Sequence, residues 1–190
     1  MPDKLIESEV FENIDFSQEK LTYAIFEECQ FTVCNFEKVN LTNYVFVECV
    51  FTGCNFSLTN FTNASIQGAE FRKCKMMGVR FDQCNQSLLS FSFNECILHL
   101  ASFRQLKIPG TKFLNCNLKE VDFTESNLTK ALIKQSDLYQ AVFDNTLLEN
   151  ADLRTAENYS IDPENNYVNG AKVSLNGLPG MLQKYGLEIE

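Results

Sequence analysis

Cysteine and histidine are the residues of this chain with the most obvious capacity for chemistry, and their pattern argues against it. The sequence contains eight cysteines and one histidine, which are the side chains that form disulfides, bind zinc or carry out thiol chemistry. No Cys-x-x-Cys pair occurs. The single histidine, His99, falls at a position whose side chain is expected to point away from the core. No Ser-His-Asp set, glycine-rich phosphate loop or carboxylate pair in a cleft can be assigned. We therefore predict no catalytic, metal-binding or cofactor-binding residues, no cofactor, no small-molecule substrate and no enzymatic activity.

The charge of the chain argues against direct binding to nucleic acid. Its 25 acidic and 16 basic residues give a net charge of −9 and a pI near 4.7, whereas contacts with phosphates need Lys and Arg. The acidic residues concentrate in segments 7–48 and 137–164. A basic patch is expected between these segments, formed by Arg72, Lys73, Lys75 and Arg80.

The sequence also contains no signal for a membrane. No stretch approaches the roughly 18 apolar residues of a membrane span. The first residues lack the basic segment and apolar core of a secretory signal. We expect a cytoplasmic protein with no membrane partner.

Large apolar residues recur at every fifth position through most of the chain. The spacing holds without exception from Phe11 to Phe81, fails at Gln86, and resumes two residues later from Leu88 to Leu153. A period of five matches neither the 3.6 residues of a helical turn nor the alternation of a strand. The chain must therefore bend once in every five residues.

The position two before each large residue is mostly occupied by a small one. All eight cysteines occupy such positions, for example Cys29, Cys49 and Cys96. Residues two apart in an extended segment point the same way, so each unit sends one small and one large side chain inward. Cysteine in this setting behaves as a small buried hydrophobe.

The repeating pattern A/C-D/N-L/F-x-x resembles that of the pentapeptide-repeat proteins. It is seen in Cys34-Asn35-Phe36, Cys54-Asn55-Phe56 and Val121-Asp122-Phe123, and the resemblance covers roughly residues 9–155. It implies an all-β solenoid, a right-handed quadrilateral β-helix with twenty residues in each coil. Residues twenty apart should then stack, and we expect the core ladder to include Phe11, Phe31, Phe51, Phe71, Phe93, Phe113, Cys34, Cys54 and Cys74.

Two features interrupt this pattern. The β-helix is expected to span residues 1–157, with a register slip at 82–90. The slip is either a tolerated bulge or a kink that divides the rod into two sub-rods, with a short helical turn at 85–90. Residues 158–190 are expected to form a C-terminal α/β cap, with a strand over 167–174, a helix over 178–185 and a last strand over 187–190.

The cap has more apolar residues than are needed to cover the end of one solenoid. Closing an exposed end is its simplest role. The alternative that we favour is a dimerisation module formed by Val168, Val173, Leu178, Met181, Leu182, Tyr185, Leu187 and Ile189.

The length, the slip after Met76-Met77-Gly78-Val79 and the tail from Asn158 resemble the topoisomerase-interacting branch of the family. That branch includes quinolone-resistance proteins and immunity proteins against microcin B17 and albicidin. The resemblance implies a homodimer, joined by its C-terminal modules, that mimics DNA and binds bacterial DNA gyrase or topoisomerase IV. Many quinolone-resistance members carry long projecting loops, for which this chain has no room.

Joining two chains through their C-termini would bring the 137–164 segments together at the centre of the rod. The residues expected to contact the topoisomerase there flank core positions and should point outward: Asp137, Asp144, Glu149 and Asp152. A rival hypothesis is a structural or scaffolding solenoid that binds another protein and has no connection with topoisomerases.

Overall fold

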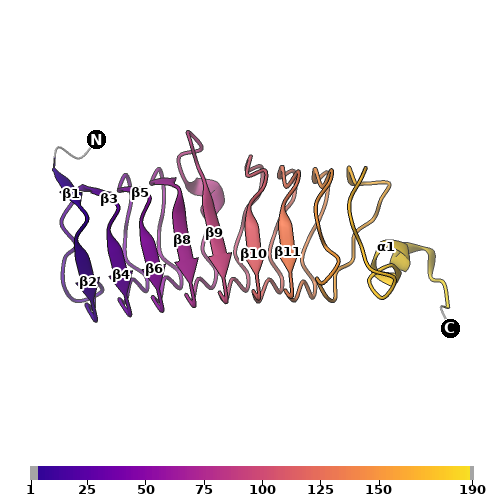
Figure 1. Cartoon of the computed structure of the whole chain (residues 1–190), viewed down its shortest axis with the longest axis horizontal. Coiled ribbons are helices and arrows are strands. Elements are labelled where there is room, and N and C mark those ends of the chain that lie inside the picture. The colour runs from indigo at the N-terminus through magenta and orange to yellow at the C-terminus, as the bar shows by residue number, and fades with distance from the viewer. Residues whose placement is uncertain (1–3, 189–190) are drawn as a thin grey trace.

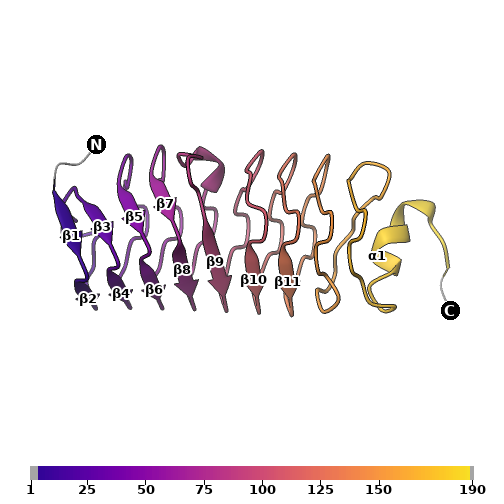
Figure 2. The same cartoon turned by 45° about the horizontal axis from the view of Figure 1, so that its top comes forward.

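The computed structural model describes residues 4–188, which form a straight rod of stacked coils (Figures 1 and 2). All strand pairs in this range are parallel, and they form two sheets. One sheet has the order β1 (Leu5–Glu7), β3 (Ile25–Glu27), β5 (Val45–Val47) and β7 (Ser65–Gln67). The other has the order β11 (Leu132–Lys134), β10 (Lys112–Leu114), β9 (Phe91–Asn94), β8 (Ala69–Arg72), β6 (Val50–Thr52), β4 (Gln30–Thr32) and β2 (Val10–Glu12).

Each coil has four faces, which we number in chain order. Face 1 is the sheet β1-β3-β5-β7, and face 2 is the seven-stranded sheet. Faces 3 and 4 are rows of single bridges, such as Asn35–Asn55 on face 3 and Asn40–Asn60 on face 4. Consecutive pentapeptides therefore lie on consecutive faces, and residues twenty apart share a face. The fold is an all-β solenoid, a right-handed quadrilateral β-helix.

The five-residue period arises from a short extended segment followed by a tight corner. In β3, Phe26 points inward while Ile25 and Glu27 lie on the outer side. The corner residue Glu28 has φ of 52°, and most other corners also have positive φ. Such values are unfavourable for residues with a Cβ. The corner is stabilised by the next coil, because the Glu28 amide donates a hydrogen bond to the Val47 carbonyl at 2.9 Å.

Stacked side chains fill the interior of the rod. On face 2, Phe31 pairs with Phe51 and Phe51 with Phe71, with ring centroids 4.9 and 5.0 Å apart. The same column begins at Phe11, which is only partly buried, and continues through Phe93 and Phe113.

The cysteines form columns of their own beside the aromatic rings. All eight are free and buried. The Cys54 Sγ lies 3.3 Å from the Phe31 carbonyl, and the Cys74 Sγ lies 3.4 Å from the Phe51 carbonyl. Burial raises the pKa of Cys49 and Cys84 to about 12. These thiols are packing groups that remain protonated at neutral pH.

The register slip is an insertion within one coil, and the rod continues through it. Phe71 pairs with Phe93, and β8 joins β9 in the seven-stranded sheet, so face 2 is not interrupted. The interruption falls on face 1, where the sheet ends at β7. The inserted residues follow β7 on this face and project beyond the neighbouring coils (Figure 1). Of the two alternatives for the slip, the continuous face 2 fits the bulge.

Two details of the insertion differ from expectation. The helical turn is η1 (Phe81–Gln83), earlier than the predicted 85–90. The inward residues are Leu89 and Phe91, whereas Leu88, expected to be inward, has φ of 60° and is 74% exposed. The extra residues rotate Leu88 out onto a corner.

The coil continues beyond residue 157, so the expected boundary between repeat and cap lies within the last coil. Tyr167 bridges Leu147 and Lys172 bridges Asp152. These bridges place Val168 and Val173 one coil beyond Leu148 and Leu153, partly buried against the core. The predicted strand over 167–174 is wrong, because this segment forms isolated bridges instead of an extended strand.

The remainder of the cap is helical over its described part. It contains α1 (Pro179–Leu182) and η2 (Gln183–Tyr185), in the region predicted to be a helix. Leu187 and Glu188 are not in a strand. The rest of the predicted last strand, including Ile189, lies outside the described residues.

Candidate binding surface

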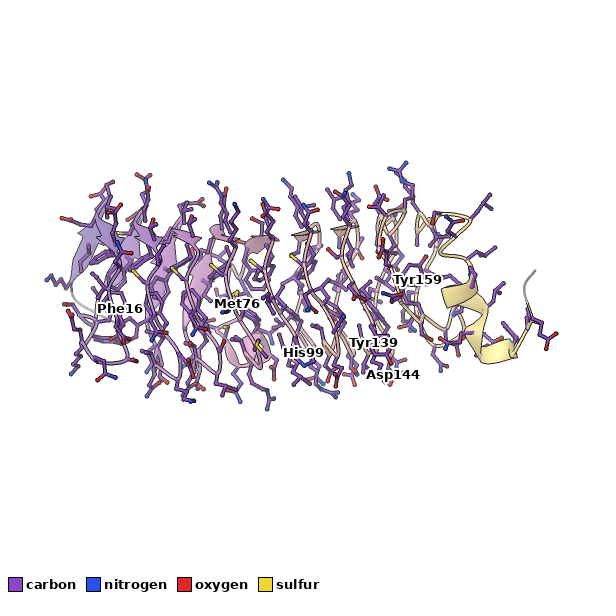
Figure 3. All side chains as sticks on the ribbon, turned by 90° about the horizontal axis from the view of Figure 1, so that it is seen from below. Phe16, Met76, His99, Tyr139, Asp144 and Tyr159 are labelled. Atoms are coloured by element: carbon purple, nitrogen blue, oxygen red, sulfur yellow. The ribbon has the colours of Figure 1, made fainter. Side chains whose placement is uncertain are left out.

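The four acidic residues predicted to form one contact lie on four different faces of one coil. Asp137 is on face 3, where it bridges Asn117, and Asp152 is on face 2, beside β11. Asp144 follows Val142 on face 4, and Glu149 follows Leu147 on face 1. Asp144 lies at the edge of the rod in Figure 3. Consecutive pentapeptides turn around the rod, so these side chains cannot form one flat contact surface.

Two of the four carboxylates are also neutralised by neighbours. Asp152 is 6% exposed, contrary to the outward position expected for it, and accepts hydrogen bonds from Arg154 Nε and Nη2 at 2.9 and 2.8 Å. The hydrogen-bonded Arg154 lowers the pKa of Asp152 to about 2.

Asp137 forms an ion pair with Lys119 at 3.0 Å and accepts a hydrogen bond from Asn158 at 2.8 Å. Burial opposes ionisation of this carboxyl, but the hydrogen bonds from Asn158 and Lys119 lower its pKa overall. Asp144 and Glu149 form no ion pair with any residue that the structure describes.

Other acidic residues near the C-terminus are held by the cap. Lys184 lies 2.8 Å from Asp162 and 2.5 Å from Glu164, and the Tyr185 hydroxyl donates a hydrogen bond to Glu164 at 2.8 Å. Hydrogen bonds from Lys184 lower the pKa of both carboxyls. Much of the negative charge in 137–164 is therefore compensated within the chain.

The uncompensated acidic surface lies at the other end of the rod. Glu7 and Glu27 are direct neighbours in the β1–β3 pair, and Glu28 and Glu48 occupy successive corners between faces 1 and 2. We call the following residues the acidic row: Glu7, Glu9, Glu27, Glu28 and Glu48. None of them forms an ion pair within residues 4–188. Reading the sequence in columns of twenty would have identified the row.

The basic residues between the acidic segments do not form the expected patch. Arg72 lies on face 2 and Lys73 at the corner that follows it, whereas Lys75 is on face 3 and Arg80 on face 4. Arg72 is paired with Glu70, and Arg80 with Asp82 at 2.6 Å. The four basic residues do not form a patch, because residues that are close in the sequence are distributed around the rod.

The residues predicted to form the dimer interface divide into two groups. Val168, Val173 and Met181 contribute to the end of the core, with Met181 buried. Leu182 is partly buried, and the exposed group comprises Leu178, Tyr185 and Leu187, at 42%, 52% and 58%. The exposed group could supply a contact with another molecule.

No group of three or more His, Cys, Asp or Glu side chains in residues 4–188 could hold a metal ion. No helix in this range is long and apolar enough to cross a membrane. A groove of about 650 Å³ lies between the last coil and the cap, near Arg154, Tyr159 and Gly177. Tyr159 marks its position in Figure 3.

The stacked coils, the filled interior and the surface columns define the class of protein as a β-solenoid whose outer faces are available for binding. The family model described as "Pentapeptide repeat region" matches residues 24–91 and 75–153. The chain belongs to the pentapeptide-repeat family. No curated protein sequence matches it.

Three solved structures share the fold. A trypsin-treated variant of QnrB1, a plasmid-mediated fluoroquinolone resistance protein, has 14% identity and a TM-score of 0.65, covering 98% of this chain and 100% of its own. A second QnrB1 variant has 16% identity and a TM-score of 0.62, with 97% and 99% covered. HetL from the cyanobacterium Nostoc sp. strain PCC 7120, involved in heterocyst differentiation regulation, has 16% identity and a TM-score of 0.68, with 93% and 89% covered.

Proposed function

We propose that the chain is a DNA-mimicking binding protein for a bacterial type II topoisomerase, DNA gyrase or topoisomerase IV. In this proposal it acts in the cytoplasm, has no enzymatic activity, and occupies the DNA-binding groove. It thereby protects the topoisomerase from poisons such as quinolones or modulates its response to them. The likeness to QnrB1, a fluoroquinolone resistance protein, supports a role of this kind.

The acidic row is the observation that carries the proposal. Its five carboxylates lie on three successive coils, which are about 4.8 Å apart. The row therefore carries on the order of one negative charge per 3 Å of rod, comparable to the 3.4 Å per charge along a DNA strand. A groove that binds DNA through Lys and Arg would attract such a surface, mainly by accelerating encounter.

The dimer is the second part of the proposal. Two chains joined through Leu178, Tyr185 and Leu187 would form a rod with both N-termini at its outer ends. The acidic rows would then lie on the two arms of the dimer. This differs from the sequence-based expectation, in which the charge lay at the centre.

A supercoiling assay with purified protein and purified gyrase tests the function. We expect inhibition of supercoiling at micromolar protein, or rescue of supercoiling when a quinolone is present. The Glu28→Lys/Glu48→Lys variant should lose most of this effect. The Asp144→Lys/Glu149→Lys variant makes the same change in net charge outside the acidic row and serves as the control. No effect of the unmodified protein in either form of the assay would exclude the proposal.

A second candidate is a scaffolding solenoid that binds a different protein. The likeness to HetL, a regulator of differentiation, favours this alternative. Exposed apolar residues on face 3 or its corners also favour it, including Leu58, Met77, Leu100 and Tyr139. A monomer in solution that leaves gyrase unaffected would support this alternative.

A further inference from the structure

Faces 1 and 2 carry opposite charges in the two halves of the rod. The acidic row lies before the insertion. After the insertion the same two faces carry exposed lysines, which we call the basic row: Lys107, Lys112, Lys130, Lys134 and Lys172. This half of the strip also carries Glu149 on face 1, which forms no ion pair with a described residue, and Asp152 on face 2, which is paired with Arg154. No member of the basic row forms an ion pair within the described part of the chain. One strip of surface is therefore negative at one end and has a net positive charge at the other.

The two rows use the same positions in the coil. Glu28 and Glu48 are corner residues between faces 1 and 2, and Lys130 is the corner residue of the same column after the insertion. Each of the three has its amide hydrogen-bonded to the coil that follows. The charges in both rows therefore repeat at the same coil spacing of about 4.8 Å.

The middle of the strip is locally neutral and has one exposed apolar residue. Arg72 is paired with Glu70, and Lys73 lies 3.8 Å from Glu95. Leu88 lies on the insertion that projects from the rod in Figure 1 and is 74% exposed. The insertion is held at this corner column, because the Gly68 amide donates a hydrogen bond to the Ser90 hydroxyl at 2.8 Å.

We propose that two copies of the chain associate side by side and antiparallel through this strip, about a twofold axis that passes near Leu88. A twofold axis brings each residue on it against its own copy. Charged residues there would repel, whereas the apolar Leu88 side chains can pack together. Away from the axis, the acidic row of each copy faces the basic row of the other. Glu48 lies at the level of Lys130 and Lys134, and Glu7 at the level of Lys172. Glu27 lies at the level of Glu149, so this pair opposes the attraction between the rows.

This association is independent of the topoisomerase and uses a surface other than the cap. It would cover the acidic row, so self-association would compete with any partner that binds that row. The attraction comes from many exposed charges, each contributing little on its own. The pair should therefore be favoured at low ionic strength and dissociate at about 1 M salt, where the Debye length is about 3 Å.

Cross-linking through a new cysteine tests the position of the axis. The Leu88→Cys variant of the full chain should form a covalent dimer under mild oxidation at low ionic strength, because the two thiols would meet at the axis. The native cysteines are buried and should contribute little. Leu58→Cys is the control, since Leu58 is also exposed but lies at the far corner of face 3. Equal cross-linking of the two variants would overturn the proposal.

Complementary charge reversal tests the pairing of the rows. Glu28→Lys/Glu48→Lys should make both halves of the strip basic, and Lys130→Glu/Lys134→Glu should make both halves acidic. Each variant alone should lose the salt-sensitive association in sedimentation velocity, whereas their equimolar mixture should recover it as a heterodimer. Circular dichroism checks that both variants are folded. A mixture that sediments as the separate variants do would contradict the proposal.

Discussion

The two halves of the rod share one backbone and differ in what fills and covers it. Before the insertion, the face 2 column consists of phenylalanines, and the carboxylates of the acidic row have no ion-pair partner within residues 4–188. After the insertion the column changes from Phe113 to Ile133, and carboxylates such as Asp152 are paired with basic residues. The coil depends only on inward positions and corners. Its surface charge can therefore vary along the rod without changing the fold.

The largest expected change in the free energy of unfolding concerns the interior of the N-terminal half. Phe51 is 1% exposed and stacks between Phe31 and Phe71. Phe51→Ala should lower the free energy of unfolding by about 3–5 kcal/mol, because it removes packing on both sides and leaves a cavity. Urea denaturation followed by circular dichroism measures this loss.

Phe51→Leu is the matched control for the comparison of the two halves. Ile133 occupies the same column in the C-terminal half, so an aliphatic side chain fits this position in the coil. We expect the leucine variant to lose only about 1–2 kcal/mol. If leucine costs as much as alanine, the N-terminal half requires stacked aromatic rings and the two interiors are not equivalent.

A smaller effect concerns the paired carboxylate of the C-terminal half. Asp152 has a pKa of about 2 in the folded chain, against about 3.9 in an unfolded chain. Its ionised form therefore stabilises the fold above about pH 4, and this contribution is lost as the pH falls to about 2. Asp152→Ala should lower the free energy of unfolding by about 2 kcal/mol at pH 7 and by much less near pH 2. Equal losses at both pH values would show that the ion pair does not stabilise this half.

The smallest effect concerns the unpaired carboxylates of the N-terminal half. Glu27 lies directly opposite Glu7 in the β1–β3 pair, and like charges opposite one another are unfavourable. Glu27→Gln should raise the free energy of unfolding by roughly 0.2–0.5 kcal/mol at low ionic strength and leave it unchanged at high salt. Thermal denaturation at two salt concentrations measures the difference. A clear loss of stability would mean that Glu27 has a structural partner.

The coil could be predicted from the sequence because its period is local. Every fifth residue is large and apolar, and the chain has few ways to bury such a pattern. The insertion was harder to place, since the pattern shows only that two residues are added. The packing of Leu89 and Phe91, which rotates Leu88 outward, is decided by the neighbouring coils.

The binding surface could be predicted only in part, because residues that are close in the sequence lie on different faces of the rod. Asp137, Asp144, Glu149 and Asp152 are close in sequence but lie on successive faces. The pairing of Asp152 with Arg154 was visible in principle, since residues two apart in an extended segment share a side. The contacts of Lys184 with Asp162 and Glu164 depend on how the cap folds back, which the sequence pattern does not specify.

A competition experiment between the chain and DNA for purified gyrase tests the central claim most directly. A DNA mimic must use the groove that DNA uses, so added duplex DNA should displace the labelled chain from gyrase. The Glu28→Lys/Glu48→Lys variant should bind at least tenfold more weakly, a change of about 1.4 kcal/mol. The Asp144→Lys/Glu149→Lys variant should retain most of the affinity. Binding that is unaffected both by DNA and by reversal of the acidic row would contradict the account.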